Sequence, residues 1–159
     1  MDELMQKSVS NFMTKDVFAI SKDETIKKLF KLMDEGGILG VPVVDENEIV
    51  VGIVTESDLL KHFTTLKSPQ AVQLLGSLIY LEDTGDFNQH LKQHCAETVK
   101  DLMTEDVTTI HQDASLSAAI DTMAGNKVNR IPVTDGDGKL VGIITRTDIV
   151  HQLAKLKTP

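Results

Sequence analysis

The chain has 159 residues but a single cysteine, Cys95, no tryptophan and one tyrosine. With one cysteine, no disulfide can form within the chain. The longest apolar stretch, residues 71–81, is far shorter than the roughly 20 residues that a transmembrane helix needs. Residues 1–5 do not combine a basic region with an apolar one, so no secretory signal peptide is indicated. We therefore expect a cytoplasmic protein with no membrane partner.

Basic charge is also scarce. Sixteen Lys and Arg residues face 24 Asp and Glu residues, which gives a net charge of −8. Such a surface repels a phosphate backbone on average, and the sequence contains no basic stripe. Nucleic acid is therefore not expected as a partner.

The sequence lacks the motifs of common enzymes. It has no P-loop and no Gly-x-Gly-x-x-Gly segment, and no histidine stands in a motif with a Ser or Cys nucleophile. His90 and His94 are spaced as a metal pair beside Cys95, but Cys95 is predicted to point with Phe87 and Leu91 into an apolar stripe. We expect no catalytic residues and no metal site. A small hydrolase is the enzyme alternative, and it would need a catalytic set that we do not find.

The chain does contain an internal repeat at an offset of 90 residues. Residues 9–63 align with residues 99–153 without a gap. A period this long, occurring only twice, indicates two copies of one small unit. Because such units rarely bury enough apolar surface alone, the two copies are expected to pack face to face, share a core and leave matched clefts.

Each copy is predicted to form strand, helix, strand, strand and helix. In the first copy residues 17–20 form a short strand, Asp23 caps a helix, and Gly36-Gly37 ends it. Residues 41–44 and 49–54 then form a hairpin.

The second copy follows the same plan. Asp113 is the predicted cap and Gly125-Asn126 the stop. Residues 135–138 form a plain turn, because they lack the ligand spacing and distal Glu of a calcium loop. Since Pro42 and Pro132 cannot donate to a β-ladder, the strand that contains each is predicted to be an edge strand or to be broken there.

The residues between the copies have no partner in the repeat. Ser68-Pro69 is typical of a helix start, and Asp86 with Gln89 indicates a second one. An apolar face follows the first start: Ala71, Val72, Leu75, Leu78 and Ile79. We predict a helical hairpin here. The chain is thereby divided into a first repeat at 1–66, a helical insert at 67–98 and a second repeat at 99–159.

Two strand-to-helix junctions share the pattern Thr-x-x-Asp, in Thr55 with Asp58 and in Thr145 with Asp148. This spacing is that of a capping box, which starts a helix without any ligand. The same atoms also suit a nucleotide. A helix N-terminus offers free N–H groups to a phosphate, and an Asp one turn on can accept from the two hydroxyls of a ribose. The motif alone leaves both interpretations open.

The ordered set of motifs, present twice, resembles a tandem pair of CBS domains, named for cystathionine beta-synthase and often called a Bateman module. It resembles the stand-alone bacterial type. Three pieces carry the resemblance, with partners 90 residues on: residues 9–16 with Met13-Thr14, Val41–Asp45, and Gly52–Thr55 with Asp58. The resemblance implies an α/β (α+β) fold of two β-α-β-β-α repeats with pseudo-twofold symmetry, whose sheets pack through their helices.

The resemblance also implies two clefts for adenine-containing ligands: AMP, ADP, ATP, S-adenosylmethionine or, in some bacteria, cyclic dinucleotides. No cofactor is required. In that family the Thr contacts phosphate or ribose, the Asp holds the ribose, and residues before the proline and near the first strand hold the base. Carried over, the first cleft would use Thr55, Asp58, Val41, Pro42, Ala19 and Ile20. The second would use Thr145, Asp148, Ile131, Pro132, Thr109 and Ile110.

The two clefts differ in charge. Arg130 and Arg146 accompany the second, where the first has Gly40 and Glu56. Guanidinium groups pair well with phosphate, whereas Glu56 would repel it. We predict that the second cleft takes the phosphorylated nucleotide, and that the first is empty, weaker, or suited to a neutral or cationic ligand. The alternative is that both arginines form surface ion pairs.

The sequence therefore predicts a regulatory module and not an enzyme. It would sense an adenosyl ligand and alter the shape of a homodimer or the binding of an unidentified protein. The alternative is a structural interaction protein that acts through its insert helices.

Overall fold

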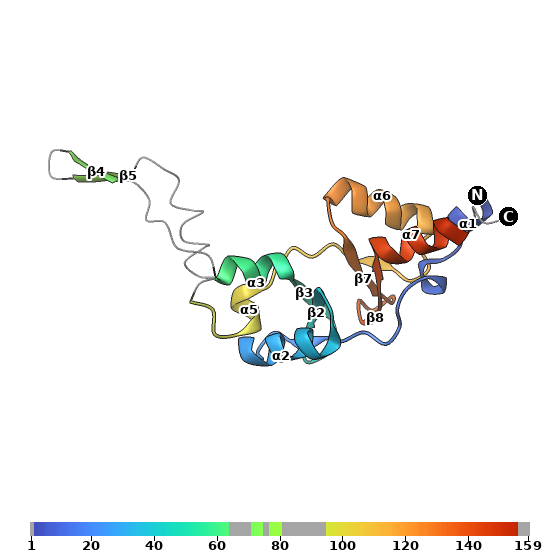
Figure 1. Cartoon of the computed structure of the whole chain (residues 1–159), viewed down its shortest axis with the longest axis horizontal. Coiled ribbons are helices and arrows are strands. Elements are labelled where there is room, and N and C mark those ends of the chain that lie inside the picture. Colours follow the sequence, from blue (N-terminus) through green and yellow to red (C-terminus); the bar gives the residue numbers. More distant parts are fainter. Residues whose placement is uncertain (1, 64–70, 75–76, 81–94, 156–159) are drawn as a thin grey trace.

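Two three-stranded sheets of identical topology make up most of the described chain (Figure 1). The computed structural model describes residues 2–63, 71–74, 77–80 and 95–155. In each sheet the short first strand is parallel to the second, and the second is antiparallel to the third. The first unit contains β1 (Ile20–Ser21), α2 (Ile26–Gly36), β2 (Gly40–Val44), β3 (Val50–Thr55) and α3 (Glu56–His62).

The second unit repeats this order 90 residues later. It contains β6 (Ile110–His111), α6 (Leu116–Asn126), β7 (Arg130–Thr134), β8 (Leu140–Thr145) and α7 (Arg146–Lys155). The predicted mixed α/β (α+β) class and the β-α-β-β-α order are therefore confirmed. No helix in the described ranges is long and apolar enough to cross a bilayer.

The long helices begin two residues later than predicted. Their N-caps are Thr25 and Ser115, and not Asp23 and Asp113. Each hydroxyl accepts a hydrogen bond from the backbone N–H three residues on, at 3.3 and 3.1 Å. A capping side chain must directly precede the first helical residue, whereas both aspartates lie in the turn that follows β1 or β6.

The two long helices end at matching positions of the repeat. Gly37 ends α2 in the left-handed conformation with φ 58°, as predicted. In α6 the helix continues through Gly125 and Asn126, and Lys127 takes the left-handed position with φ 55°. Lys127 lies 90 residues after Gly37, so the backbone keeps the same conformation at the matching position although the side chain has changed.

Both prolines lie in central strands, contrary to the edge prediction. Pro42 is in β2 and Pro132 is in β7, each between two neighbouring strands. However, β1 and β6 pair only with the two residues that follow each proline. At the proline itself the strand has a neighbour on one side only, so its missing N–H breaks no ladder.

The segment before the first repeat packs on the second unit. It contains α1 (Asp2–Met5) and the 3-10 helix η1 (Val9–Asn11). Val9 N–H donates to the Ala114 carbonyl at 2.8 Å, and Thr14 and Ile143 exchange backbone hydrogen bonds of 2.9 and 3.0 Å. The N-terminal residues therefore complete the unit formed by the other repeat.

The segment before the second repeat crosses in the opposite direction. It contains α5 (Val99–Leu102). Val99 N–H donates to the Glu24 carbonyl at 2.9 Å, and Thr104 and Ile53 exchange hydrogen bonds of 2.9 and 3.1 Å. Each packed unit therefore contains most of one repeat together with the segment that precedes the other repeat.

The described residues form two cores and not the single shared core that was expected. One contains Val9 among residues of the second repeat, and the other contains Val99 and Leu102 among residues of the first. The helices do not join the units as the resemblance had implied, since α2 and α6 lie on opposite outer sides (Figure 1). The crossing segments and the hairpin tips connect them, the tips through hydrogen bonds of 3.2 and 3.3 Å between residues 48–50 and 138–140.

The insert differs from its prediction where the structure describes it. Ala71–Leu74 (β4) and Ser77–Tyr80 (β5) form an antiparallel hairpin and not a helix. A short apolar run with β-branched and aromatic residues suits either structure, and only two residues, 75 and 76, separate the strands. The second predicted helix, with His90 and His94, lies outside the described residues. Cys95 is exposed in a turn and not buried in a helical stripe.

The helix α5 is held by a capping box of its own. Asp101 Oδ2 accepts from the Thr98 hydroxyl at 2.6 Å and from the Thr98 N–H at 3.1 Å. The hydroxyl bond is the main cause that lowers the pKa of Asp101 below its ordinary value. The folded state therefore gains stability from ionised Asp101 above about pH 4, and loses it as the pH falls further.

We expect Asp101→Ala to lower the free energy of unfolding at pH 7 by roughly 0.3–1.5 kcal/mol, a typical value for a cap. The deficit relative to the unmodified chain should shrink as the pH falls below about 4, because the unfolded state then takes up a proton and, below its lowered pKa, folded Asp101 does so too. Urea unfolding at pH 7 and at pH 3 measures it. A deficit that stays constant with pH would show that the carboxylate charge is not involved.

Candidate ligand-binding clefts

Two clefts at matching positions lie between the units, and they differ in size. The larger, named the open cleft, has a volume of about 600 Å³, and the smaller, named the closed cleft, about 190 Å³; both reach the surface. The open cleft is lined by Thr14, Asp16, Val17, Phe18, Gly37, Ile38, Leu39, Gly40, Glu56, Asn129, Arg130, Ile143, Thr145, Arg146 and Thr147. The closed cleft is lined by Ile53, Thr55, Glu56, Ser57, Lys127, Val128, Asn129 and Arg130.

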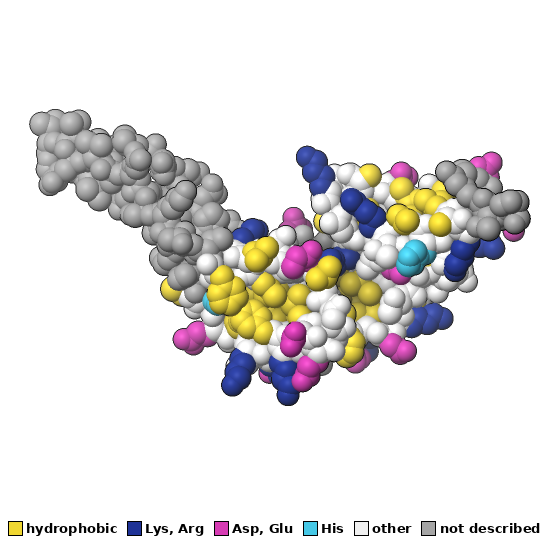
Figure 2. All heavy atoms as spheres, in the orientation of Figure 1, with side chains coloured by type: hydrophobic (Ala, Val, Ile, Leu, Met, Phe, Trp, Pro, Cys, Tyr) yellow, Lys and Arg dark blue, Asp and Glu magenta, His cyan; other side chains and the backbone are white. Residues whose placement is uncertain are grey.

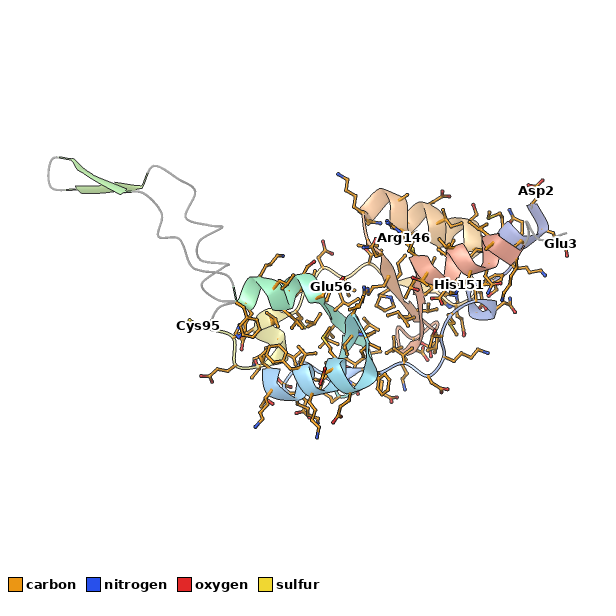
Figure 3. All side chains as sticks on the ribbon, viewed as in Figure 1. Asp2, Glu3, Glu56, Cys95, Arg146 and His151 are labelled. Carbon is orange, nitrogen blue, oxygen red and sulfur yellow. The ribbon has the colours of Figure 1, made fainter. Side chains whose placement is uncertain are left out.

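The walls of the two clefts correspond residue by residue. In the open cleft, residues 143 and 145–147 face the loop 37–40. In the closed cleft, residues 53 and 55–57 face the loop 127–130. The offset is 90 in every case, so the clefts are two copies of one site. Figure 2 shows hydrophobic side chains in the hollow between the units, and Figure 3 places Glu56 and Arg146 there.

The open cleft has a third wall, formed by Val17 and Phe18, where Thr109 and Ile110 were predicted. We had placed Thr109 and Ile110 in the second cleft, but neither lines it. Val17 and Phe18 take that place, because the chain crosses from the second unit to the first at this point. The alignment of the repeats gives no signal for the exchange, since it compares the copies and does not show which copies touch.

The remaining candidate residues fall into four groups. Asp58 and Asp148 line neither cleft, and each bonds to the threonine of its own motif. Thr145, Arg146 and Arg130 line the open cleft, and Thr55 lines the closed one. Ala19 and Ile20 line a separate groove along α2. Four residues near the prolines are buried beneath the clefts and line neither: Val41, Pro42, Ile131 and Pro132.

Both Thr-x-x-Asp motifs form capping boxes. Asp148 Oδ2 accepts from the Thr145 N–H at 2.8 Å and from its hydroxyl at 2.6 Å. Asp58 Oδ2 accepts the same two bonds from Thr55 at 2.8 and 3.0 Å. The capping interpretation is therefore confirmed as structure. It leaves one carboxylate oxygen of each Asp for other partners.

The second oxygen distinguishes the clefts. Asp58 is buried, and its Oδ1 lies 3.5 Å from the Thr104 hydroxyl and 3.9 Å from Lys61 Nζ. Asp148 is only half-buried, and within the described residues its Oδ1 accepts no corresponding hydrogen bond. Thr14, which corresponds to Thr104, lines the open cleft. The open cleft therefore keeps the hydroxyl of Thr14, whereas the corresponding hydroxyl of Thr104 contacts Asp58.

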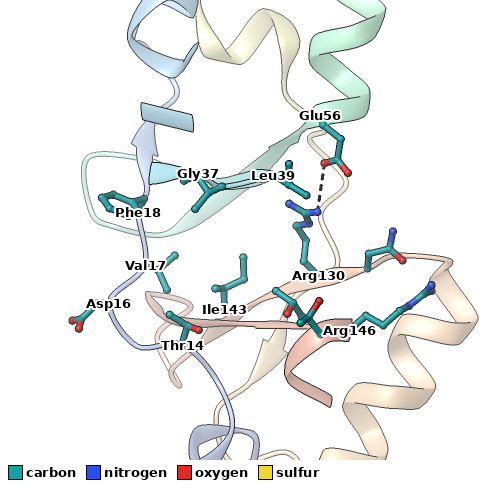
Figure 4. A pocket seen from close by; sticks show the side chains of 15 residues that line it. Thr14, Asp16, Val17, Phe18, Gly37, Leu39, Glu56, Arg130, Ile143 and Arg146 are labelled. Atoms are coloured by element: carbon teal, nitrogen blue, oxygen red, sulfur yellow. Dashed lines mark ion pairs between the residues drawn. The ribbon is translucent and has the colours of Figure 1, made fainter. Parts of the chain in front are cut away.

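The arginines also differ. Arg130 reaches from β7 to Glu56, where Nη2 lies 3.4 Å from Oε2 (Figure 4). The Arg130 side chain is 15% exposed and the Glu56 side chain 44% exposed, so the ion pair is buried on the arginine side only. Arg146 is exposed on the wall of the open cleft and forms no ion pair within the described residues. The free positive charge in this cleft is therefore Arg146.

A model of the CBS domain matches residues 9–65 and 99–155. The chain belongs to the CBS-domain family. The two matches cover both repeats and leave the insert outside, so the chain is a CBS pair.

Relatives include enzymes and proteins without an assigned activity. Inosine-5'-monophosphate dehydrogenase of Methanocaldococcus jannaschii is 30% identical over 92% of this chain, which spans only 23% of the enzyme. An uncharacterized protein of the same organism is 28% identical, with 91% of this chain and 90% of that protein covered. The chloroplastic CBS domain-containing protein CBSX1 of Arabidopsis thaliana is 31% identical, with 94% and 65% covered. The similarity to the dehydrogenase therefore concerns a minor part of that enzyme.

Solved CBS pairs share the fold. CBSX2, crystallised in complex with AMP, matches with a TM-score of 0.78 and 26% identity, over 96% of this chain and 99% of that one. The CBS pair of protein MJ0100, crystallised with 5'-methylthioadenosine and S-adenosyl-L-methionine, matches with a TM-score of 0.69 and 23% identity, over 94% and 98%. The arrangement of the two units is therefore that of a CBS pair.

Proposed function

We propose that this CBS pair is a regulatory module that binds an adenine nucleotide in the open cleft. Of these nucleotides, AMP is the ligand that we propose. The observation that carries the proposal is the difference between two otherwise matched clefts. Small-molecule sites usually have volumes of about 300–1,000 Å³, a range that includes the open cleft at about 600 Å³ and excludes the closed one at about 190 Å³.

The open cleft supplies a partner for each part of the nucleotide. Arg146 lies at the N-terminus of α7, where its guanidinium attracts a phosphate. The backbone N–H of Arg146 is already used, since it donates to the Asn129 carbonyl at 2.8 Å. We assign the ribose to the hydroxyl of Thr14, which lines the cleft, and to the half-buried Asp148, which bonds to Thr145 on the cleft wall. Val17, Ile38 and other apolar side chains provide a surface for a base.

The similarity to CBSX2 supports the choice of AMP. That protein was crystallised with AMP and is 26% identical to this chain over nearly the whole of both. S-adenosylmethionine is a less suitable occupant of the open cleft because its sulfonium cation would approach Arg146 without a phosphate to compensate.

We expect Arg146→Ala to weaken AMP binding about tenfold, in line with the loss of one charge-assisted contact to phosphate. Adenosine lacks the phosphate, so its affinity should not change. Isothermal titration calorimetry with both ligands measures the effect. Lys100→Ala removes an exposed positive charge outside the clefts and is the control. Equal losses for AMP and adenosine would contradict a phosphate contact at Arg146, and no heat with AMP on the unmodified chain would overturn the proposed function.

The proposal includes a homodimer in the cytoplasm and an unidentified protein that responds to the bound ligand. Leu60 on α3 and Phe63 next to it are each 68% exposed, and the Phe63 ring lies 5.7 Å from that of Phe30. These side chains supply an apolar surface for such a contact. The alternative of an interaction protein that acts through insert helices loses its first helix, because residues 71–80 form a hairpin.

A further inference from the structure

An apolar groove lies on the first unit, between α2 and α3 and beside the open cleft. It has a volume of about 330 Å³. Phe30, Met33 and Leu59 form its buried and half-buried part, and the exposed Phe63, directly after α3, lies at its edge. Figure 2 shows hydrophobic side chains gathered over the first unit at this place and reaching the hollow between the units. Exposed apolar surface of this kind marks a contact with another molecule.

The charged side chains that line the groove are both acidic. They are Asp34 on α2 and Glu56 on α3, and no basic residue in the described ranges lines it. Asp34 is exposed, and the ion-paired lysines of α2, Lys28 and Lys31, contact Glu24 and Glu35 instead. The groove therefore favours an occupant that is apolar and positively charged.

We propose that the groove docks one amphipathic helix of a partner protein, with apolar side chains inside it and a Lys or Arg beside Asp34. A helix suits the groove because its lining comes from helices and from the residues next to them, and contains no strand to which an extended segment could add. The inference deepens the proposed function, on which it rests for the regulatory role of the partner though not for the contact itself.

A second copy of this chain is a less suitable occupant. Two identical chains usually meet through a two-fold axis, so the same surface lies on both sides of the contact. Asp34 and Glu56 of one copy would then approach those of the other, and each chain carries a net charge of −8. Like charges opposed across an interface disfavour association.

The groove shares three residues with the open cleft, namely Ile38, Leu39 and Glu56. Leu39 is 60% exposed, and Figure 4 shows Leu39 and Glu56 on the same side of this cleft. A helix in the groove would therefore contact residues that also face a ligand in the cleft. Shared contacts of this kind allow the binding of one molecule to change the affinity for the other.

Two fluorescein-labelled model peptides test the proposal. Both carry Leu at positions i, i+3, i+4 and i+7 of a helix, and the positions between are Lys in one peptide and Glu in the other. Fluorescence anisotropy at physiological ionic strength, without nucleotide, should show one Lys peptide bound per chain and the Glu peptide bound about tenfold more weakly or less. No binding of the Lys peptide, or equal binding of both, would overturn the proposal.

Three variants locate the contact. Phe63→Ser should weaken binding of the Lys peptide about tenfold, because aromatic side chains supply much of the affinity of such contacts. Asp34→Asn, an exposed substitution that leaves the core intact, should weaken it about threefold. Leu60→Ser is the matched control, since Leu60 is as exposed as Phe63 but does not line the groove. Equal losses in Phe63→Ser and Leu60→Ser, or full affinity in both Phe63→Ser and Asp34→Asn, would place the peptide elsewhere and overturn the proposal.

Sedimentation velocity tests the second copy as occupant. The unmodified chain and Phe63→Ser should sediment alike, and a dimer that Phe63→Ser dissociates would overturn the proposal. Because the peptide titration contains no nucleotide, its result is independent of AMP. If the Lys peptide binds as expected but AMP gives no heat, the proposed nucleotide function fails and the docking surface stands. If AMP binds and the peptide does not, only the docking surface fails.

Discussion

Asp148→Ala should abolish the rise in melting temperature that AMP produces in the unmodified chain. At a hundredfold excess over the dissociation constant, a ligand that binds only the folded state adds about 2.7 kcal/mol. For a chain of this length that corresponds to about 5–10 °C. The substitution removes the carboxylate to which the proposal assigns the ribose, and thermal unfolding with and without AMP measures the loss.

The difficulty is that Asp148 also caps α7, so the variant loses some stability without any ligand. Asp101→Ala is the matched control, because Asp101 makes the same two bonds to Thr98, which lines neither cleft, whereas Asp148 bonds to Thr145 on the wall of the open cleft. Both variants should be less stable than the unmodified chain by a similar amount. Only Asp148→Ala should lose the response to AMP, and a full response in that variant would remove Asp148 from the site.

Leu102→Ala should destabilise the protein by roughly 2–5 kcal/mol, the usual cost of a large cavity in a core. Leu102 is fully buried among residues of the first repeat although it belongs to the second in sequence. Leu60→Ala, in an exposed position on α3, should cost far less. Urea unfolding measures both.

Hydrogen exchange would show where the damage lies. If α5 completes the first unit, amide protection in Leu102→Ala should fall more in α2 than in α6. A larger loss in α6 would mean that the segment packs within its own repeat, contrary to the structure.

The repeat, its elements and the motif were predictable because they depend on local patterns. The offset of 90 residues located every strand and helix of the second unit from those of the first. The capping boxes at Thr55 and Thr145 follow from a spacing of three residues. The charge difference between the clefts was also readable, since Arg130, Arg146, Gly40 and Glu56 occupy matched positions in the alignment.

Local patterns did not suffice where two signals competed. Asp23 and Thr25 both suit an N-cap, and the turn after β1 selects Thr25. Residues 71–80 suit a helix or a hairpin, and the structure has the hairpin. The motif Thr98 with Asp101 has the same spacing as the cleft motifs yet lines no cleft, so spacing alone does not identify a binding residue.

The sequence by itself determined that the chain contains two copies of one small unit. It also determined that the arginines at the cleft positions, Arg130 and Arg146, belong to the second copy. The tertiary structure decided which residues meet. The segments before each repeat cross to the other unit, which brings Val17 and Phe18, and not Thr109 and Ile110, into the open cleft. It also decided that the matched clefts differ in volume and that the Arg130 side chain lies against Gly40 and pairs with Glu56. Contacts between copies depend on how the copies pack, and an alignment of one copy with the other contains no information about that packing.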